Sequence, residues 1–331
     1  MNQRRSAVRW ITVLTVLLSF LTLGVPTASA QTLYGAPAGV LPVTSAAGLP
    51  IRYAATTEAL REASAVAERS GDTTRSRVLA ALSRPGRQFL SFDARGSGQA
   101  VEVIGDLTTA RRITILVPGA DNDLNTFDAR GSDPYKAPGG GALALADAAR
   151  EIDRGTPLAV VAWLGYRTPS TGGVSVLTDE RAKDGARRLR GLLDTVRAVN
   201  PTAGLSLLCH SYGSVVCAET LFDSVVPVTD AVLFASPGVD VGRASDLRGA
   251  DRVWAGRSSD DWIRHVAGEH LLMAGLGIGR LTDPMSSAFG ARRFRTGDGG
   301  HSDYLRPGTR SLHNLALIAL GRAADGAPSR G

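Results

Sequence analysis

The sequence predicts an α/β fold in which a mainly parallel β-sheet is covered by helices on both faces. Short apolar runs alternate with segments of helical periodicity along most of the chain, as in parallel strands joined by crossover helices. Residues 113–117 form a nearly continuous apolar run, which is typical of a strand buried on both faces. The third observation is a serine-containing turn between a predicted strand and a predicted helix, described below, which fits the same architecture.

The predicted elements follow this alternation. We expect strands at residues 89–92, 100–105, 113–117, 158–164, 205–209, 231–235, 252–255 and 292–295. We expect helices at residues 142–152, 179–199, 214–225, 263–273 and 310–321. The first two strands precede the first crossover and should form an antiparallel edge. The connection from Ala235 to Arg252 is short, so no large helical lid is expected, and the loop from Asp121 to Gly141 is the remaining wall for a pocket.

The first 30 residues have the composition of a secretory signal peptide. Three arginines precede the apolar run Trp10–Val25, and Ala28-Ser29-Ala30 supplies the small residues that signal peptidase recognises. At about 1.5 Å per helical residue the run spans roughly 24 Å, short of a hydrocarbon core of about 30 Å. We therefore expect cleavage before Gln31, a secreted or extracytoplasmic protein, and no stable membrane insertion after cleavage; the alternative is an uncleaved membrane anchor.

The rest of the chain is expected to form an extension, one domain and a tail. Residues 31–86 are the predicted N-terminal extension, with an extended lead-in to Ala55 and two short helices within Thr56–Leu82. Residues 87–322 form the α/β domain, and residues 323–331 a disordered tail.

Composition argues against several classes of partner. The formal net charge is +6, three of the arginines lie in the signal segment, and no basic run is interleaved with aromatic residues, so nucleic acid is not expected. His265 and His270 have no companion ligand set for a metal. Residues 275–279, GLGIG, follow a predicted helix rather than a strand, which argues against a dinucleotide site. We expect a monomer without metal or cofactor.

The segment Cys209–Ser214, CHSYGS, lies between a predicted buried strand and a predicted helix. A serine on such a sharp turn projects its hydroxyl above the sheet, provided that small residues stand two positions before and after it. Cys209 and Gly213 meet this demand, although glycine is usual at the first of these positions. The motif predicts Ser211 as a nucleophile; the alternative is a polar turn that caps the helix.

A serine nucleophile needs a base and a carboxylate that orients it, in the chain order Ser, acid, His. His301 lies in a glycine-rich loop between the last predicted strand and the last helix, which favours it as the base. The acid should follow a strand, where Asp261 and Asp260 are both available and Asp240 is the third choice. The alternative for one of the pair is a helix cap.

An acyl-transfer site also needs two backbone N–H donors for the developing oxyanion. We expect one from Tyr212, directly after the nucleophile. The other is expected from Ala120, in the turn that follows the strand ending at Val117. The glycine-rich segment 138–141 is interpreted as a mobile loop beside this turn; the alternative is a cradle for an anion.

These motifs, with the Asp260-Asp261 pair and the segments 289–291 and 300–304, resemble those of α/β-hydrolases, and in particular an actinobacterial branch described as a domain of unknown function. The likeness covers about Gln88 to Gly321 and implies an α/β-hydrolase fold and a catalytic triad. We therefore expect a serine hydrolase acting on small-molecule or lipid-like carboxylic esters. The alternatives are an acyltransferase with the same triad, or a non-catalytic envelope-binding protein.

The two cysteines, Cys209 and Cys217, flank the predicted nucleophile. In an exported protein such a pair can oxidise to a disulfide, which would lock the strand to the helix. The alternative is a pair of buried small apolar side chains.

Overall fold

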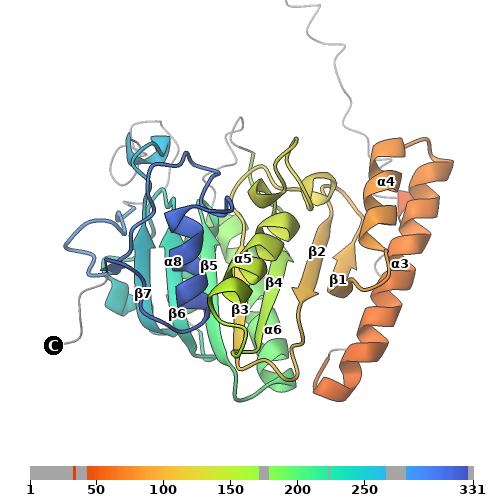
Figure 1. Cartoon of the computed structure of the whole chain (residues 1–331). Coiled ribbons are helices and arrows are strands. Elements are labelled where there is room, and N and C mark those ends of the chain that lie inside the picture. The colour runs from red at the N-terminus through yellow and green to blue at the C-terminus, as the bar shows by residue number, and fades with distance from the viewer. Residues whose placement is uncertain (1–32, 35–42, 171–178, 223, 266–280, 327–331) are drawn as a thin grey trace, which may run out of the picture.

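The computed structural model describes residues 33–34, 43–170, 179–222, 224–265 and 281–326 (Figure 1). The predicted signal peptide, and most of the helix expected at residues 263–273, lie outside the described residues. Within those ranges, no helix has the length and apolar character needed to cross a membrane.

The described strands form one sheet in the order β1-β2-β4-β3-β5-β6-β7-β8 (Figure 1). Strands β1 and β2 pair antiparallel, as do β2 and β4, and all other neighbours are parallel. The predicted antiparallel edge is therefore confirmed. The strand bounds are β1 Gln88–Asp93, β2 Gln99–Ile104, β3 Arg112–Val117, β4 Leu158–Leu164, β5 Gly204–His210, β6 Val228–Phe234, β7 Ala250–Gly256 and β8 Arg292–Arg293.

Helices cover both faces of the sheet, which gives two apolar layers. On one face lie α5 (Pro138–Ile152) and α8 (Arg310–Ala319), which pack against each other. On the other lie α6 (Asp179–Val199) and α7 (Gly213–Phe222), also in mutual contact. Because both faces are covered, the central strands are buried along nearly their whole length.

The N-terminal extension contains two helices that stand beside the β1 edge of the sheet (Figure 1). A short 3₁₀ turn, η1 (Ala46–Gly48), leads into α3 (Leu49–Arg69), and α4 (Thr73–Leu82) follows. The Arg52 guanidinium donates to the Leu90 carbonyl of β1 at 2.9 Å. The expected lead-in to Ala55 is therefore wrong from Ala46 onward, because Pro50 is compatible with the first turn of a helix and Leu49 is buried.

The glycine-rich segment 138–141 is the buried first turn of α5, so its interpretation as a mobile loop is wrong. A Cβ atom on Gly140 would come within 2.3 Å of the Pro134 carbonyl oxygen, and one on Gly139 within 2.8 Å of the Phe127 ring. The glycines therefore allow the preceding loop, with η2 (Leu124–Thr126) and η3 (Pro134–Lys136), to pack directly on the helix.

Within the described residues, the connections after β6 and β7 contain only short 3₁₀ turns. Between β6 and β7 the chain forms only the 3₁₀ turn η5 (Ala244–Asp246), in agreement with the expected absence of a large lid there. After β7 it forms η6 (Trp262–His265).

The chain stays packed on the domain beyond the predicted boundary at residue 322. Ala324 is buried, and the Asp325 carbonyl accepts a hydrogen bond from the Arg295 amide.

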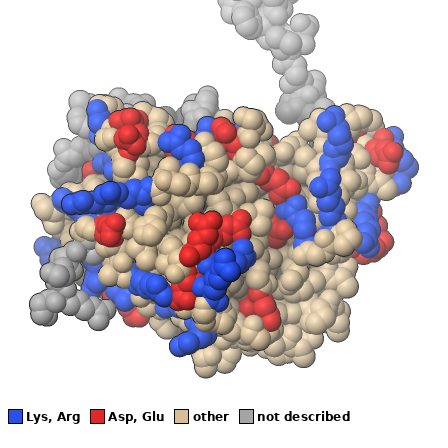
Figure 2. Space-filling view, in the orientation of Figure 1, with Lys and Arg blue, Asp and Glu red and all other residues tan. Residues whose placement is uncertain are grey.

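On the face viewed in Figure 2, acidic and basic side chains lie beside one another rather than in a broad area of one sign.

Candidate active site

Ser211 lies on a sharp turn between β5 and α7, at the carboxyl end of the central strands. Its φ of 52° is in the left-handed region, which is strained for a residue with a side chain. The Ser211 amide donates to the Phe234 carbonyl at 3.0 Å, which holds the turn against β6. A Cβ atom on Gly213 would come within 2.6 Å of the Val117 carbonyl oxygen, so glycine is required for this close approach.

A disulfide joins the strand and the helix on either side of this turn. Cys209 at the end of β5 and Cys217 in α7 are bonded, and both side chains are fully buried. The disulfide, one of the two alternatives for these residues, is thus present. It occupies the position two residues before Ser211 and ties the turn to both of its flanking elements.

The structure brings Ser211, His301 and Asp261 together in one hydrogen-bonded row. His301 Nε2 lies 2.9 Å from Ser211 Oγ, and His301 Nδ1 lies 2.8 Å from Asp261 Oδ1. Because an ionised carboxylate only accepts hydrogen bonds, Nδ1 carries the proton of a neutral imidazole. Nε2 is then the acceptor that faces the serine hydroxyl.

Of the three carboxylates considered from the sequence, only Asp261 lies next to His301. It is fully buried, whereas Asp260 is exposed and accepts a hydrogen bond from Ser259, and Asp240 is exposed. Burial alone would raise the pKa of Asp261. Hydrogen bonds from His301, from the Ile263 amide and from a tyrosine hydroxyl outweigh it, so the pKa lies below its ordinary value and the carboxylate stays ionised.

That tyrosine is Tyr304, to which sequence reasoning assigned no role. Its hydroxyl donates to Asp261 Oδ2 at 2.7 Å and accepts from the Ser258 amide at 2.8 Å. Burial, and next the negative charge of Asp261, raise the pKa of Tyr304, which keeps the phenol protonated. Its position three residues after His301 was visible in the sequence, but its contact with the acid was not.

His210 supports the loop that carries His301. Its Nε2 lies 2.7 Å from the His301 carbonyl oxygen, and because a carbonyl only accepts, Nε2 is the donor. Its ring also packs against Phe234 and Tyr304. Burial, and then the proximity of His301, lower the pKa of His210 to about 3, so this ring is neutral.

The turn after β3 packs directly on Ser211. A Cβ atom on Gly119 would come within 2.6 Å of Ser211 Cβ, so glycine is required at this position. Ala120 is the next residue of the turn. The Asn122 amide donates to the carbonyls of Gly119 and Ala120, at 3.1 and 2.8 Å. The buried Tyr166 hydroxyl donates to the Pro118 carbonyl. Tyr212 occupies the position directly after Ser211.

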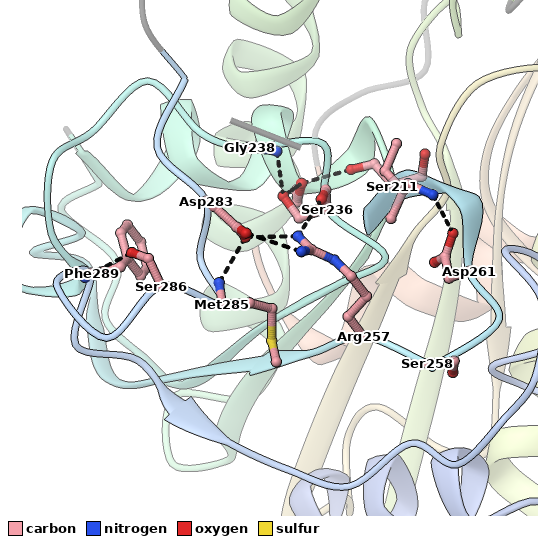
Figure 3. Close-up of polar contacts among 12 residues, drawn as sticks. Ser211, Ser236, Gly238, Arg257, Ser258, Asp261, Asp283, Met285, Ser286 and Phe289 are labelled. Carbon is pink, nitrogen blue, oxygen red and sulfur yellow. Dashed lines mark hydrogen bonds and ion pairs between the residues drawn. The ribbon is translucent and has the colours of Figure 1, made fainter. Parts of the chain in front are cut away.

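A polar chain extends from the serine turn toward the segment after residue 280 (Figure 3). Ser214 Oγ donates to the Ser211 carbonyl at 2.6 Å and lies 2.7 Å from Ser236 Oγ. The Arg257 guanidinium donates to the Ser236 carbonyl and to both oxygens of the Asp283 carboxylate (Figure 3). These contacts fix the loops after β6 and β7 relative to the turn.

The remaining described histidines lie outside this row. His265 contacts Arg264 in η6, and His313 is exposed on α8. Among the described residues, no group of three His, Cys, Asp or Glu side chains is placed to hold a metal ion.

The sequence matches the profile of a protein family described as "Alpha/beta hydrolase" over residues 93–271. An uncharacterized protein of Mycobacterium tuberculosis is 30% identical over 265 residues, which cover 70% of this chain and 39% of that protein. An uncharacterized protein of Mycobacterium bovis is 31% identical over 175 residues, 49% of this chain and 62% of that protein. The chain thus spans well under two thirds of the length of the first of these relatives.

Among solved structures, an α/β serine hydrolase without lid from Xanthomonas campestris resembles this chain with a TM-score of 0.42 and 17% identity, covering 74% of this chain and 98% of that one. The resemblance to α/β-hydrolases and to uncharacterized actinobacterial proteins, predicted from the sequence motifs, is confirmed by the family profile and the mycobacterial relatives.

Proposed function

Because the chain belongs to the α/β-hydrolase family, we propose that it is a serine hydrolase that cleaves carboxylic esters through an acyl-Ser211 intermediate. One observation carries the proposal: His301 bridges the Ser211 hydroxyl and a buried, ionised Asp261. This is the arrangement that activates a serine, whose hydroxyl is otherwise a weak nucleophile.

In the first half of the reaction, Ser211 Oγ attacks the ester carbonyl carbon while its proton passes to His301 Nε2. The imidazolium that forms is stabilised by Asp261, with which Nδ1 is already hydrogen bonded. His301 then donates its Nε2 proton to the leaving alcohol oxygen as the carbon–oxygen bond of the ester breaks. The acyl group remains bonded to Ser211.

In the second half, water replaces the alcohol. His301 removes a proton from the water, the hydroxide attacks the acyl carbon, and the proton returns to Ser211 Oγ as the acid leaves. We assign the amides of Ala120 and Tyr212 to the oxyanion in both halves. This assignment is supported by the packing of the Gly119 turn on Ser211 and by the two hydrogen bonds through which Asn122 holds that turn.

Secretion belongs to the same proposal. It is supported by the signal-like composition of residues 1–30 and is consistent with the Cys209–Cys217 disulfide, since disulfides persist in oxidising compartments. N-terminal sequencing of protein from culture medium tests it. We expect Gln31 as the first residue; full-length protein retained in the cytoplasm would contradict secretion.

A fluorophosphonate probe, which phosphonylates activated serines, tests the enzymatic assignment. We expect stoichiometric labelling of the wild-type protein, loss of labelling in Ser211→Ala, and unchanged labelling in Ser259→Ala. Ser259 is the matched control because it is an exposed serine at the same edge of the sheet. Equal labelling of wild type and Ser211→Ala would overturn the proposal.

A further inference from the structure

A small cavity lies beside His210, on the side of the site formed by the loop after β3 and the segment after His301. Its volume is about 40 Å³. Since one water needs about 10–15 Å³ by this measure, the cavity holds a group of a few heavy atoms rather than an acyl chain. Its polar and charged lining residues are Asn122, Arg130, Tyr135, Lys136, His210 and Ser302.

Among the described residues that line this cavity, both charged side chains are cationic and none is a carboxylate. Lys136 is paired with Asp133 at 2.7 Å. Arg130, which is half-buried, forms no ion pair with any residue that the structure describes. An uncompensated guanidinium in a partly enclosed site favours an anionic ligand, which it can bind through two parallel hydrogen bonds.

Two further features point to a ligand at the same place. Helix α5 begins at the cavity with Pro138, and its first turn has neither a capping side chain nor an acidic residue. Its amino end therefore adds positive potential. Asn122, of which 6% is exposed, also lines the cavity, and its Oδ1 has no hydrogen-bond partner among the residues that the structure describes. A buried acceptor of this kind is costly unless a donor reaches it.

We propose that this cavity binds an anionic group of the substrate, so that the enzyme prefers esters that carry a carboxylate or phosphate near the scissile bond. The inference rests on the proposed ester hydrolysis and names its substrate class. Arg130 binds the anionic oxygens, the amino end of α5 contributes to their stabilisation, and Asn122 Oδ1 accepts from a hydroxyl or N–H of the same substrate. The Arg130 backbone is held by its mutual hydrogen bonds with Asp133, so its side chain can be changed without unfolding the loop.

Pairs of esters with and without a carboxylate measure the preference for an anionic substrate. The ratio of kcat/KM for 4-nitrophenyl hemisuccinate to that for 4-nitrophenyl butyrate reports an anion on the acyl side. The ratio for 4-acetoxybenzoate to phenyl acetate reports an anion on the alcohol side. We expect one of the two ratios to exceed ten in the wild type and to fall about tenfold in Arg130→Gln, because a charge-assisted hydrogen bond is lost. Arg187→Gln, which removes the same charge from an exposed position on α6, should change neither ratio.

A binding measurement separates failure of the anion site from failure of the proposed hydrolysis. Calorimetric titration of Ser211→Ala with succinate or inorganic phosphate should show binding that high salt weakens and that the added Arg130→Gln change abolishes. If no ester is hydrolysed but this binding is present, the anion site stands and the proposed hydrolysis fails. If neutral and anionic esters are cleaved equally well and Arg130→Gln changes neither ratio, the anion site is overturned and the hydrolase is not.

Discussion

Two buried aspartates at opposite ends of the parallel strands compare a structural carboxylate with the one to which we assign a role in catalysis. Asp230 in β6 and Asp261 after β7 are both fully buried. Each accepts a hydrogen bond from an aromatic side chain, from Trp254 Nε1 at 2.8 Å in the first case and from the Tyr304 hydroxyl at 2.7 Å in the second.

The difference lies in the partner that balances the charge. Asp230 is held by two guanidinium groups, those of Arg112 at 3.1 Å and Arg252 at 2.7 Å. Arginine is always charged in proteins, so this cluster has one state and joins three strands. Asp261 faces a histidine, whose positive charge can form during a reaction and disappear after it. A permanent counterion fixes the Asp230 cluster in one state, whereas the histidine beside Asp261 is compatible with the proposed catalysis.

The largest expected effect comes from removing the charge of Asp261. In Asp261→Asn, kcat for a neutral ester should fall about 10⁴-fold, because an amide neither fixes the Nδ1–H tautomer nor stabilises the imidazolium. The free energy of unfolding should change by only about 1 kcal/mol, since most of the hydrogen bonds persist. Steady-state kinetics and urea titration measure the two effects. Asp260→Asn is the matched control, and a comparable loss of activity in it would contradict the assignment.

The substitution Asp230→Asn should instead lower the stability of the protein and leave kcat nearly unchanged. Asp230→Asn leaves two buried guanidinium groups without a countercharge, which should lower the free energy of unfolding by about 3–5 kcal/mol. The kcat of the folded protein should stay within about twofold of the wild type. An unchanged denaturation midpoint would show that the cluster does not hold the sheet together.

Mild acid should weaken the protein through His210. Its pKa in the folded protein is about 3, below the ordinary value of about 6.5, so its contribution to stability is complete above pH 6.5 and is lost as pH falls toward 3. Between pH 7 and pH 4.5 the loss should be on the order of 2 kcal/mol. Asp261, whose pKa is also lowered, contributes stability that is lost only below its ordinary pKa near 4.

Urea titrations at pH 7 and pH 4.5 measure this effect. The variant His210→Gln keeps an N–H donor for the His301 carbonyl but does not titrate. We expect its stability to fall much less between the two pH values than that of the wild type. An equal fall in both proteins would mean that other groups cause the acid sensitivity.

The smaller of the two expected losses of kcat distinguishes the two aromatic donors. Tyr304→Phe removes the hydrogen bonds to Asp261 and from the Ser258 amide, and kcat should fall about tenfold. Trp254→Phe removes the donor to Asp230 and should lower stability by about 1–3 kcal/mol without changing kcat. Rate effects of equal size in the two variants would remove the distinction between the two sites.

The sequence predicted the sheet, and it pointed to the central residues of the candidate site, because their signals are local. The alternation of apolar runs and helices placed the strands, and the strand–serine–helix pattern identified Ser211 together with its chain order relative to His301. Asp261 and Asp260 were not separable, since only the direction of each side chain after β7 distinguishes them. Tyr304 was missed because its contact with Asp261 joins segments far apart in the sequence. Arg130 was missed because the cavity that it lines forms only in the folded chain.

The start of α5 was misjudged for a related reason. Glycines are poor helix formers, so the segment 138–141 favours a loop when it is taken alone. In the folded protein the close packing of the loop around Pro134 requires glycine, and tertiary contacts outweigh the local preference.

Direct detection of the acyl-enzyme tests the central claim most closely. The wild-type protein and His301→Ala are mixed with 4-nitrophenyl butyrate, quenched in acid within the first turnover, digested and examined by mass spectrometry. We predict a butyryl group on Ser211 in the wild type and none in His301→Ala. Release of 4-nitrophenol by the wild type with no adduct on Ser211, or with an adduct on another residue, would contradict the account.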